Sequence, residues 1–314
     1  MKKKTFLVLG SNGQDGKIFS NLINKKLYKI IGVSKKNINS KYDKNYSLNF
    51  LNKNSDQELR KILYHEKPNY VINFSGLSSG QSMEKNSFEK FFKVNTKPVI
   101  SIINYCIDFP KTVLVQASSR EIFGDPVETP QSENTIKKPR NYYGITKYLS
   151  DQIIDYNRKK YKLNLKSAIL YNHESIYRGK NFLIPKICNF CSYLAIHPKT
   201  ERKLKIGNIK TKRDWMHADN TVEAIIKMIF DKRNSDYVIG YGKSLSIEDI
   251  LKIAFSKINK DYNDFIEVDV SLTHADEKNI VEANISKISK ELGWTPKVNI
   301  SDLVNELILK GIKK

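Results

Sequence analysis

Cysteine is scarce in this chain, and its scarcity excludes two kinds of scaffold. The 314 residues contain three cysteines, Cys106, Cys188 and Cys191. So few thiols cannot form the disulfide framework of a small secreted domain. Cys188 and Cys191 have the spacing of zinc ligands, but no second pair is present to complete a tetrahedral site. They lie in an apolar helical pattern, so we expect them in a hydrophobic core and predict no metal site.

Long apolar runs are also missing from the sequence. No run approaches the roughly 20 residues that a membrane-spanning helix needs. Met1 and three lysines are followed by only five strand-like residues, 5–9, before Gly10. Such a run is too short for the apolar region of a signal peptide. The sequence therefore predicts a soluble, cytoplasmic protein.

Arginine is rare although the chain is strongly basic. The 54 basic residues exceed the 33 acidic ones by 21, yet only eight are arginine and 46 are lysine. Proteins that clamp nucleic acid usually depend on arginine forks, so we expect no nucleic-acid partner. Lysine is spread along the chain together with 30 Asn and 38 Ile. Two interpretations of the lysine excess remain. One is a compositional preference of the host, and the other is a basic cleft for an anionic ligand.

The first half of the chain alternates short apolar runs with longer helical patterns. Hydrophobic residues make up 40% of the chain, which is enough for a substantial core. Near-continuous apolar strands separated by helices indicate a buried parallel sheet with helices on both faces. The expected strands are residues 5–9, 28–33, 70–74, 112–116 and 165–170, and the expected helices include 55–66, 88–106 and 141–161.

Beyond residue 170 the alternation becomes irregular. We expect further helices at 179–196, 220–231, 246–258 and 301–309, the third capped by Ser246 with Asp249. The sequence predicts a Rossmann-type, doubly wound parallel α/β sheet with a smaller C-terminal α/β substrate-binding domain. We expect residues 1–170 to form the nucleotide-binding domain, with 214–240 returning to it. Residues 171–213 and 241–314 would form the substrate-binding domain.

Three glycines follow the first predicted strand and open the first helix. Gly10, Gly13 and Gly16 let the backbone turn sharply and approach a pyrophosphate. The helix N-terminus then offers free N–H groups to the phosphates. The alternative is a tight turn that binds nothing.

The end of the second strand indicates which dinucleotide is bound. An acidic residue there would accept a hydrogen bond from the 2′-hydroxyl of NAD. This chain instead has Ser34, Lys35 and Lys36. The missing acid and the two ammonium groups favour the 2′-phosphate of NADP.

Tyr143 and Lys147 lie one helical turn apart, near the carboxyl ends of the predicted strands. A lysine ammonium beside a phenol lowers the phenol's pKa, and a phenolate can take a proton from a hydroxyl while hydride leaves the adjacent carbon. With 17 Tyr and 46 Lys the spacing also arises by chance, and Tyr156 with Lys160 is a second such pair. We expect that second pair to be structural.

A hydroxyl and a carboxylate follow the preceding strand. Ser119 can hydrogen-bond the reacting hydroxyl, and Glu121 two residues later supplies a carboxylate. Plain Rossmann oxidoreductases need only the serine, tyrosine and lysine. The added glutamate indicates acid–base chemistry at a second carbon.

These motifs together resemble the extended short-chain dehydrogenase/reductase family, and within it the GDP-mannose 4,6-dehydratases. The similarity covers essentially the whole chain. The matching segments are residues 10–16, 116–124, 139–147, 170–175 with Arg178-Gly179, 213–215 and 292–296. The resemblance implies tightly held NADP and a redox-neutral dehydration of a nucleotide sugar by a homodimer or homotetramer.

The resemblance also implies roles for individual residues. Tyr143 would accept the C4 hydroxyl proton, Glu121 would remove the C5 proton, and Ser119 would replace the usual threonine. The implied cofactor-binding residues are Gly10, Asn12, Gly13, Gln14, Asp15, Gly16, Ser34, Lys35, Lys36, Asn49, Phe50, Phe74, Ser75, Gly76, Tyr143, Lys147, His173 and Arg178. The implied substrate-binding residues are Ser78, Arg120, Asn172, Lys186 and Arg213.

Several positions depart from the family pattern. Arg120 stands where a small polar residue or an acid is expected, and it either recognises the substrate or faces solvent. Thr273 replaces an arginine that would contact the nucleotide, and Asn49 replaces an aspartate beside the adenine. The segment after Lys36 is short for the family's tetramer-forming loop. The leading prediction is a 4,6-dehydratase acting on GDP-mannose or a related GDP-sugar. The alternatives are a 4-epimerase or 4-keto reductase, and a non-catalytic NADP sensor.

Overall fold

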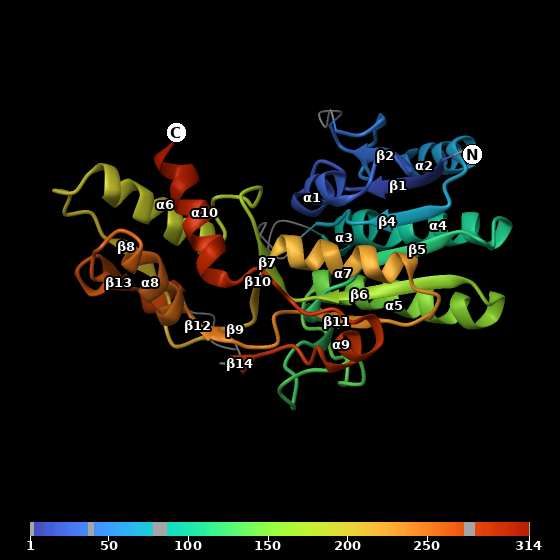
Figure 1. The fold of residues 1–314 in the computed structure, drawn as a ribbon. Helices are drawn as coiled ribbons and strands as arrows, with labels where there is room; N and C mark the ends of the chain where they lie inside the picture. Colours follow the sequence, from blue (N-terminus) through green and yellow to red (C-terminus); the bar gives the residue numbers. More distant parts are fainter. Residues whose placement is uncertain (1–2, 37–40, 78–86, 273–279, 314) are drawn as a thin grey trace.

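Seven parallel strands form the centre of the structure (Figure 1). The computed structural model describes residues 3–36, 41–77, 87–272 and 280–313. Across the sheet the strands are β3 (Lys44–Ser47), β2 (Tyr28–Ser34), β1 (Lys4–Leu9), β4 (Tyr70–Asn73), β5 (Val113–Ala117), β6 (Asn164–Leu170) and β11 (Tyr237–Ile239). Every neighbouring pair is parallel. The chain moves outward from β1 in one direction and from β4 in the other, which opens a crevice at the carboxyl ends of these two strands.

This topology confirms the predicted doubly wound sheet. All five expected strands are present within one or two residues of their predicted ends. β3 was not predicted, because its four residues are Lys-Asn-Tyr-Ser and carry little apolar pattern. An edge strand of this kind forms by pairing with β2, and its own propensity contributes little.

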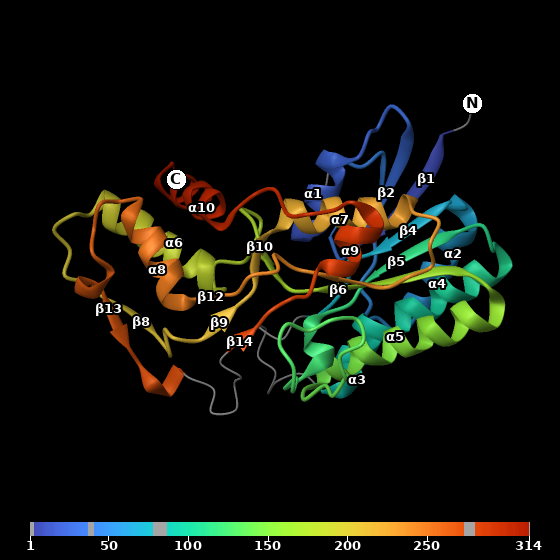
Figure 2. The same cartoon turned by 60° about the horizontal axis from the view of Figure 1, so that its bottom comes forward.

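Helices cover both faces of the sheet, as the two views in Figures 1 and 2 show. Side chains alternate along a strand. Phe6 and Val8 therefore pack in one core and Leu7 and Leu9 in the other, all fully buried. The first core includes α1 (Gln14–Leu22), α7 (Ala218–Phe230) and α9 (Ser286–Leu292). The second includes α2 (Ser55–Glu66), α4 (Lys97–Asp108) and α5 (Tyr142–Tyr161).

The expected helix 88–106 is interrupted. It consists of α3 (Phe88–Phe91), a π-helical turn (Phe92–Thr96) and α4. The π turn carries the buried Asn95, whose Nδ2 donates to Thr146 Oγ1 at 3.0 Å and whose Oδ1 accepts from Leu77 N at 2.8 Å. Periodicity could not show the interruption, because the buried face of the helix continues through it.

A separate core lies beyond the carboxyl ends of the sheet. It is formed by α6 (Leu183–Ile196), α8 (Ile247–Ser256) and α10 (Ile300–Ile312). Cys188 and Cys191 are buried in it as free thiols, as expected. α6 begins later than predicted because Pro185 is tolerated only in a first helical turn. The predicted cap of α8 is confirmed, since Ser246 Oγ accepts from Asp249 N at 3.0 Å.

Short strands form smaller sheets outside the main sheet. They are β7 (Asn172–Glu174) with β10 (Trp215–His217), β9 (Lys212–Arg213) with β12 (Leu245–Ser246) and β14 (Ile280–Val281), and β8 (Leu204–Ile206) with β13 (Ile266–Val268). The buried Asp214 carboxylate accepts backbone hydrogen bonds from Tyr241, Gly242 and Ala283 at 2.7–3.1 Å. Within the described ranges, no helix has the length and apolar character to cross a membrane.

Candidate active site

The glycine loop after β1 has no room for side chains. Gly10 has a φ of +81°, and a Cβ there would lie 2.9 Å from the carbonyl carbon of Phe74. A Cβ on Gly16 would lie 2.5 Å from the carbonyl oxygen of Gly10. The bare backbone thus leads directly into the N-terminus of α1. This cradle fits a pyrophosphate, because N–H groups and the positive end of the helix dipole face it without side chains between.

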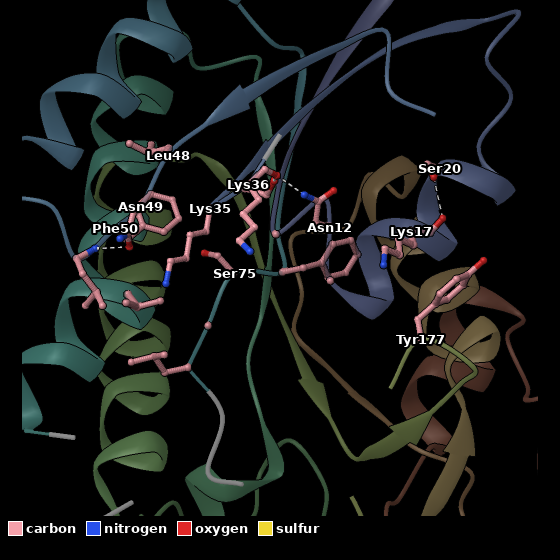
Figure 3. A pocket seen from close by; sticks show the side chains of 18 of the residues that line it. Asn12, Lys17, Ser20, Lys35, Lys36, Leu48, Asn49, Phe50, Ser75 and Tyr177 are labelled. Carbon is pink, nitrogen blue, oxygen red and sulfur yellow. Dashed lines mark hydrogen bonds between the residues drawn. The ribbon is translucent and has the colours of Figure 1, made fainter. Parts of the chain in front are cut away.

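A cavity of about 780 Å³ opens beside this loop. Figure 3 shows Asn49 and Phe50 on one side of it, Lys17 and Tyr177 on the other, and Lys35 and Lys36 between them. The sequence-predicted residues in its lining are Gly10, Asn12, Gly13, Ser34, Lys35, Lys36, Asn49, Phe50, Phe74, Ser75 and Gly76. An aromatic and apolar end with a cationic middle fits an adenine and an adjoining phosphate.

The turn after β2 is held against the glycine loop. Ser34 Oγ donates to the Lys36 carbonyl oxygen at 2.6 Å, and Asn12 Nδ2 donates to the same oxygen. Lys35 and Lys36 are exposed at the cavity. Among the described lining residues none is acidic. The lining therefore suits a phosphate better than a bare ribose hydroxyl.

Other residues that line this cavity were not predicted from the sequence. Lys17 lies in the first turn of α1, and its Nζ is 5.3 Å from the ring centroid of Tyr177. Lys41 also lines the cavity. Lys17 could have been found from its position four residues after Gly13. No local pattern pointed to Tyr177, which reaches the cavity from the distant 175–182 segment.

A second cavity of about 600 Å³ shares Gly10, Gly13, Phe74 and Gly76 with the first. The two spaces therefore adjoin along one crevice at the carboxyl ends of the strands. The other predicted residues in its lining are Gln14, Asp15, Ser119, Arg120, Glu121, Tyr143, Lys147, Asn172, His173 and Arg178. The proposed catalytic side chains thus meet beside the glycine loop.

Tyr143 and Lys147 project from the first two turns of α5. Burial raises the pKa of the Tyr143 phenol, while a hydrogen bond with Ser119 opposes the rise. Burial also lowers the pKa of Lys147 to about 8, although Asp151 and Asp15 oppose that change. Lys147 Nζ donates to the Ala117 carbonyl oxygen at 2.7 Å and lies 5.9 Å from the centroid of the Tyr143 ring.

This result differs from the expected lowering of the phenol's pKa. A buried phenolate loses its hydration. This loss disfavours the charged form of Tyr143 more than the neighbouring groups favour that form. The second Tyr/Lys pair lines neither cavity, but Tyr156 is exposed and does not have the structural packing role expected of it. Tyr156 is 60% exposed on α5.

Glu121 is held by three neighbours at the edge of the second cavity. Ser119 caps the 3₁₀ turn Arg120–Phe123, and its Oγ accepts from Glu121 N at 3.2 Å. Arg120 Nη2 is paired with Glu121 Oε1, and Asn141 Nδ2 donates to Glu121 Oε2 at 3.2 Å. The Arg120 side chain is only 16% exposed and lines the cavity, so it does not face solvent.

His173 connects β7 to the glycine loop. Its Nδ1 donates to the Tyr171 carbonyl oxygen at 2.8 Å, and its Nε2 lies 3.2 Å from Asp15 Oδ2. Burial opposes the charged ring, but the Asp15 carboxylate raises the pKa of His173 overall. Gln14 adds to the connection, since its Nε2 donates to the His173 carbonyl oxygen at 3.1 Å.

Some predicted residues lie away from both cavities. Lys186 on α6 donates to the Lys205 carbonyl oxygen at 2.9 Å, and Arg213 on β9 is buried and donates to the Lys212 carbonyl oxygen. Neither lines the cavities described above. Ser78 and Thr273 lie outside the described residues. Within the described part of the chain, no group of three His, Cys, Asp or Glu could hold a metal ion.

The chain is similar to known proteins in sequence and in fold. The family model described as GDP-mannose 4,6 dehydratase matches residues 7–307. The GDP-mannose 4,6 dehydratase of Drosophila melanogaster is 28% identical, over 99% of this chain and 87% of that protein.

Two solved structures have the same fold. The RMD protein of Pseudomonas aeruginosa, complexed with NADPH, has a TM-score of 0.82 at 15% identity, over 99% of this chain and 100% of the other. The dTDP-glucose 4,6-dehydratase of Bacillus anthracis, in complex with NAD, has a TM-score of 0.81 at 21% identity, over 98% and 96% of the two chains. By the family match over residues 7–307, the chain belongs to the GDP-mannose 4,6-dehydratase family.

Proposed function

We propose that this protein is an NADP-dependent nucleotide-sugar 4,6-dehydratase acting on GDP-mannose or a closely related GDP-sugar. One observation carries the proposal. Glu121 lines the same cavity as Ser119, Tyr143 and Lys147, and this cavity adjoins the glycine loop. A C4 oxidoreductase or epimerase needs the last three, whereas dehydration also needs a base at C5.

The chain's own groups would act in a fixed order. Tyr143 takes the C4 hydroxyl proton, with Ser119 hydrogen-bonded to the same oxygen. The C4 ketone acidifies the C5 proton, which Glu121 removes and passes to the C6 hydroxyl, so that this group departs as water. Lys147 keeps a positive charge beside Tyr143 during the proton transfer. Bound NADP would supply the hydride acceptor at C4 and the hydride donor at C6.

We propose that residues 1–170 with 214–240 hold NADP and that 171–213 with 241–314 bind the sugar nucleotide. The adenosine would lie in the cavity lined by Asn49 and Phe50, and the 2′-phosphate near Lys35 and Lys36. The nicotinamide half would face Tyr143 and the His173 segment. These placements follow the lining of the two cavities and the glycine loop that joins them.

Arg120 and Asn172 are the two proposed substrate residues that line the second cavity. Ser78, Lys186 and Arg213 stay predictions from the family resemblance. A homodimeric or homotetrameric assembly and a cytoplasmic location likewise stay predictions.

The substrate and reaction can be tested together. Purified protein supplied with NADP and GDP-mannose is expected to form a product lighter by one water, without added reductant, as measured by mass spectrometry. An unchanged mass with inversion at C4 would instead identify an epimerase. NADP binding without turnover of GDP-, UDP-, dTDP- or CDP-hexoses would contradict an enzymatic role.

The cofactor preference gives a second prediction. Replacing Lys35 and Lys36 together by glutamate should reduce the preference for NADP over NAD by at least about tenfold, because each tenfold change corresponds to about 1.4 kcal/mol of phosphate interaction. Titration calorimetry with each dinucleotide measures the ratio. Lys159→Glu is a matched control, since Lys159 is exposed on α5 and far from both cavities. An unchanged ratio would assign the 2′-phosphate to other cations, such as Lys17.

A further inference from the structure

α5 is joined to the catalytic segment after β5 by contacts at successive helical turns. Asn141, which caps α5, donates to Glu121 Oε2 at 3.2 Å. A Cβ on Gly144 would lie 2.5 Å from the Glu121 carbonyl oxygen. Lys147 Nζ donates to the Ala117 carbonyl oxygen at 2.7 Å. The helix that carries Tyr143 therefore lies directly against the segment that carries Ser119 and Glu121.

Asp151 makes the next contact between α5 and the segment that carries Ser119 and Glu121. It lies one helical turn after Lys147 and is 8% exposed. Its Oδ2 accepts from Ser118 Oγ at 2.5 Å, and its Oδ1 accepts from Ser167 Oγ on β6 at 2.7 Å. Ser118 directly precedes Ser119 and is itself buried. A buried carboxylate is costly unless it is hydrogen-bonded, so these two bonds hold their partners firmly.

We infer that Asp151 is a positioning residue for the dehydration, which holds Ser118 so that Ser119 and Glu121 face Tyr143 and which gives Lys147 a buried counter-charge. The inference rests on the proposed function, but it concerns a residue outside the two cavities. Asp151 acts through Ser118 and Lys147 and does not touch the sugar. A misplacement of about 1 Å in a reacting group can cost about a hundredfold in rate.

The charged groups around Asp151 and Lys147 determine in which direction the pKa of Lys147 moves when the Asp151 charge is removed. Lys137 and Asp236 face Asp151, while Asp15 and Asp151 face Lys147. The Asp151 carboxylate favours the charged form of Lys147 against burial, which holds its pKa at about 8. Removing that charge lets burial lower the pKa of Lys147 further. Lys147 then loses its proton at a lower pH, and activity should fall earlier as pH rises.

The chain offers a matched pair of variants for the test. Ser118→Ala and Ser167→Ala each remove one hydrogen bond to the same carboxylate, but only Ser118 adjoins the catalytic segment. Asp151→Asn keeps the shape and removes the charge. Asp151→Asn and Ser118→Ala should lower kcat by about tenfold or more with KM little changed, while Ser167→Ala should stay near the wild type. In Asp151→Asn the alkaline limb of the kcat profile should also move down by about half a pH unit or more.

A second readout does not depend on turnover. Amide hydrogen exchange in peptides covering residues 118–124 should accelerate in Asp151→Asn and Ser118→Ala but not in Ser167→Ala. If wild-type protein proves inactive on every nucleotide sugar, the dehydratase proposal fails, and the exchange measurement still decides whether Asp151 holds the segment. Equal exchange in all three variants, or an Asp151→Asn profile that matches the wild type, would overturn the inference.

Discussion

Glu121→Gln is expected to reduce water loss from the sugar nucleotide by about a thousandfold, within the range that general acid–base groups contribute. The amide has the shape of the carboxylate and can still contact Asn141, but it cannot take the C5 proton. In the proposed arrangement the adenosine and 2′-phosphate of NADP occupy the first cavity, which Glu121 does not line, so the affinity for NADP should stay within about twofold. Mass spectrometry of the product and calorimetry with NADP measure the two effects separately.

The variant should also separate the two halves of the reaction. C4 oxidation needs Tyr143, Lys147 and Ser119, so reduced cofactor should accumulate and be visible by its absorbance. Glu89→Gln provides a control, because that side chain is 69% exposed on α3 and forms an ion pair with Lys93. Water loss at the wild-type rate in Glu121→Gln would remove Glu121 from the mechanism and require another base in the second cavity.

Tyr143→Phe should abolish both oxidation and dehydration, with a loss of about a thousandfold in kcat. The phenylalanine keeps the ring beside Lys147 but has no oxygen to accept the C4 proton. Only the phenolate form of Tyr143 can take that proton, and burial disfavours this form. Accumulation of reduced cofactor after rapid mixing reports this step directly.

Tyr156→Phe is the matched control within the same helix. Tyr156 also precedes a lysine by four residues, and its ring lies 5.4 Å from Lys160 Nζ. Its ring is 60% exposed and lies away from both cavities, so the variant should keep normal activity. If Tyr143→Phe retained most of its activity, the proton acceptor at C4 would have to be a different group, with Ser119 as the nearest candidate.

The alternation of strands and helices and the glycine loop could be predicted because contiguous residues encode them. Each core strand is a short apolar run, and glycine is required at Gly10, where the loop packs against Phe74, and at Gly16, where the loop packs on its own backbone. The cap of α8 was visible as Ser246 with Asp249. The polar edge strand β3 and the π turn before α4 left no such local pattern.

Motif matching also identified most of the residues that line the two cavities, but each motif gave no contact between its own segment and another. It did not show that Arg120 pairs with Glu121. Nor did it find Lys17, Lys41 and Tyr177 at the first cavity, where two more lysines add to the basic lining. Most of the chain's lysine excess lies outside these cavities, so composition alone was a poor guide to the site.

The sequence by itself determined the fold class and the glycine loop, and it predicted Ser119, Glu121, Tyr143 and Lys147 as the catalytic residues, because these features depend on local spacing. Only the tertiary structure decided which partners those groups meet. His173 contacts Asp15, which lies 158 residues away in the sequence. Ser118 donates to Asp151, which lies 33 residues away. Such pairs form when the packed sheet brings distant strand ends together. The hydration that each group then loses sets its pKa, and no local pattern records that burial.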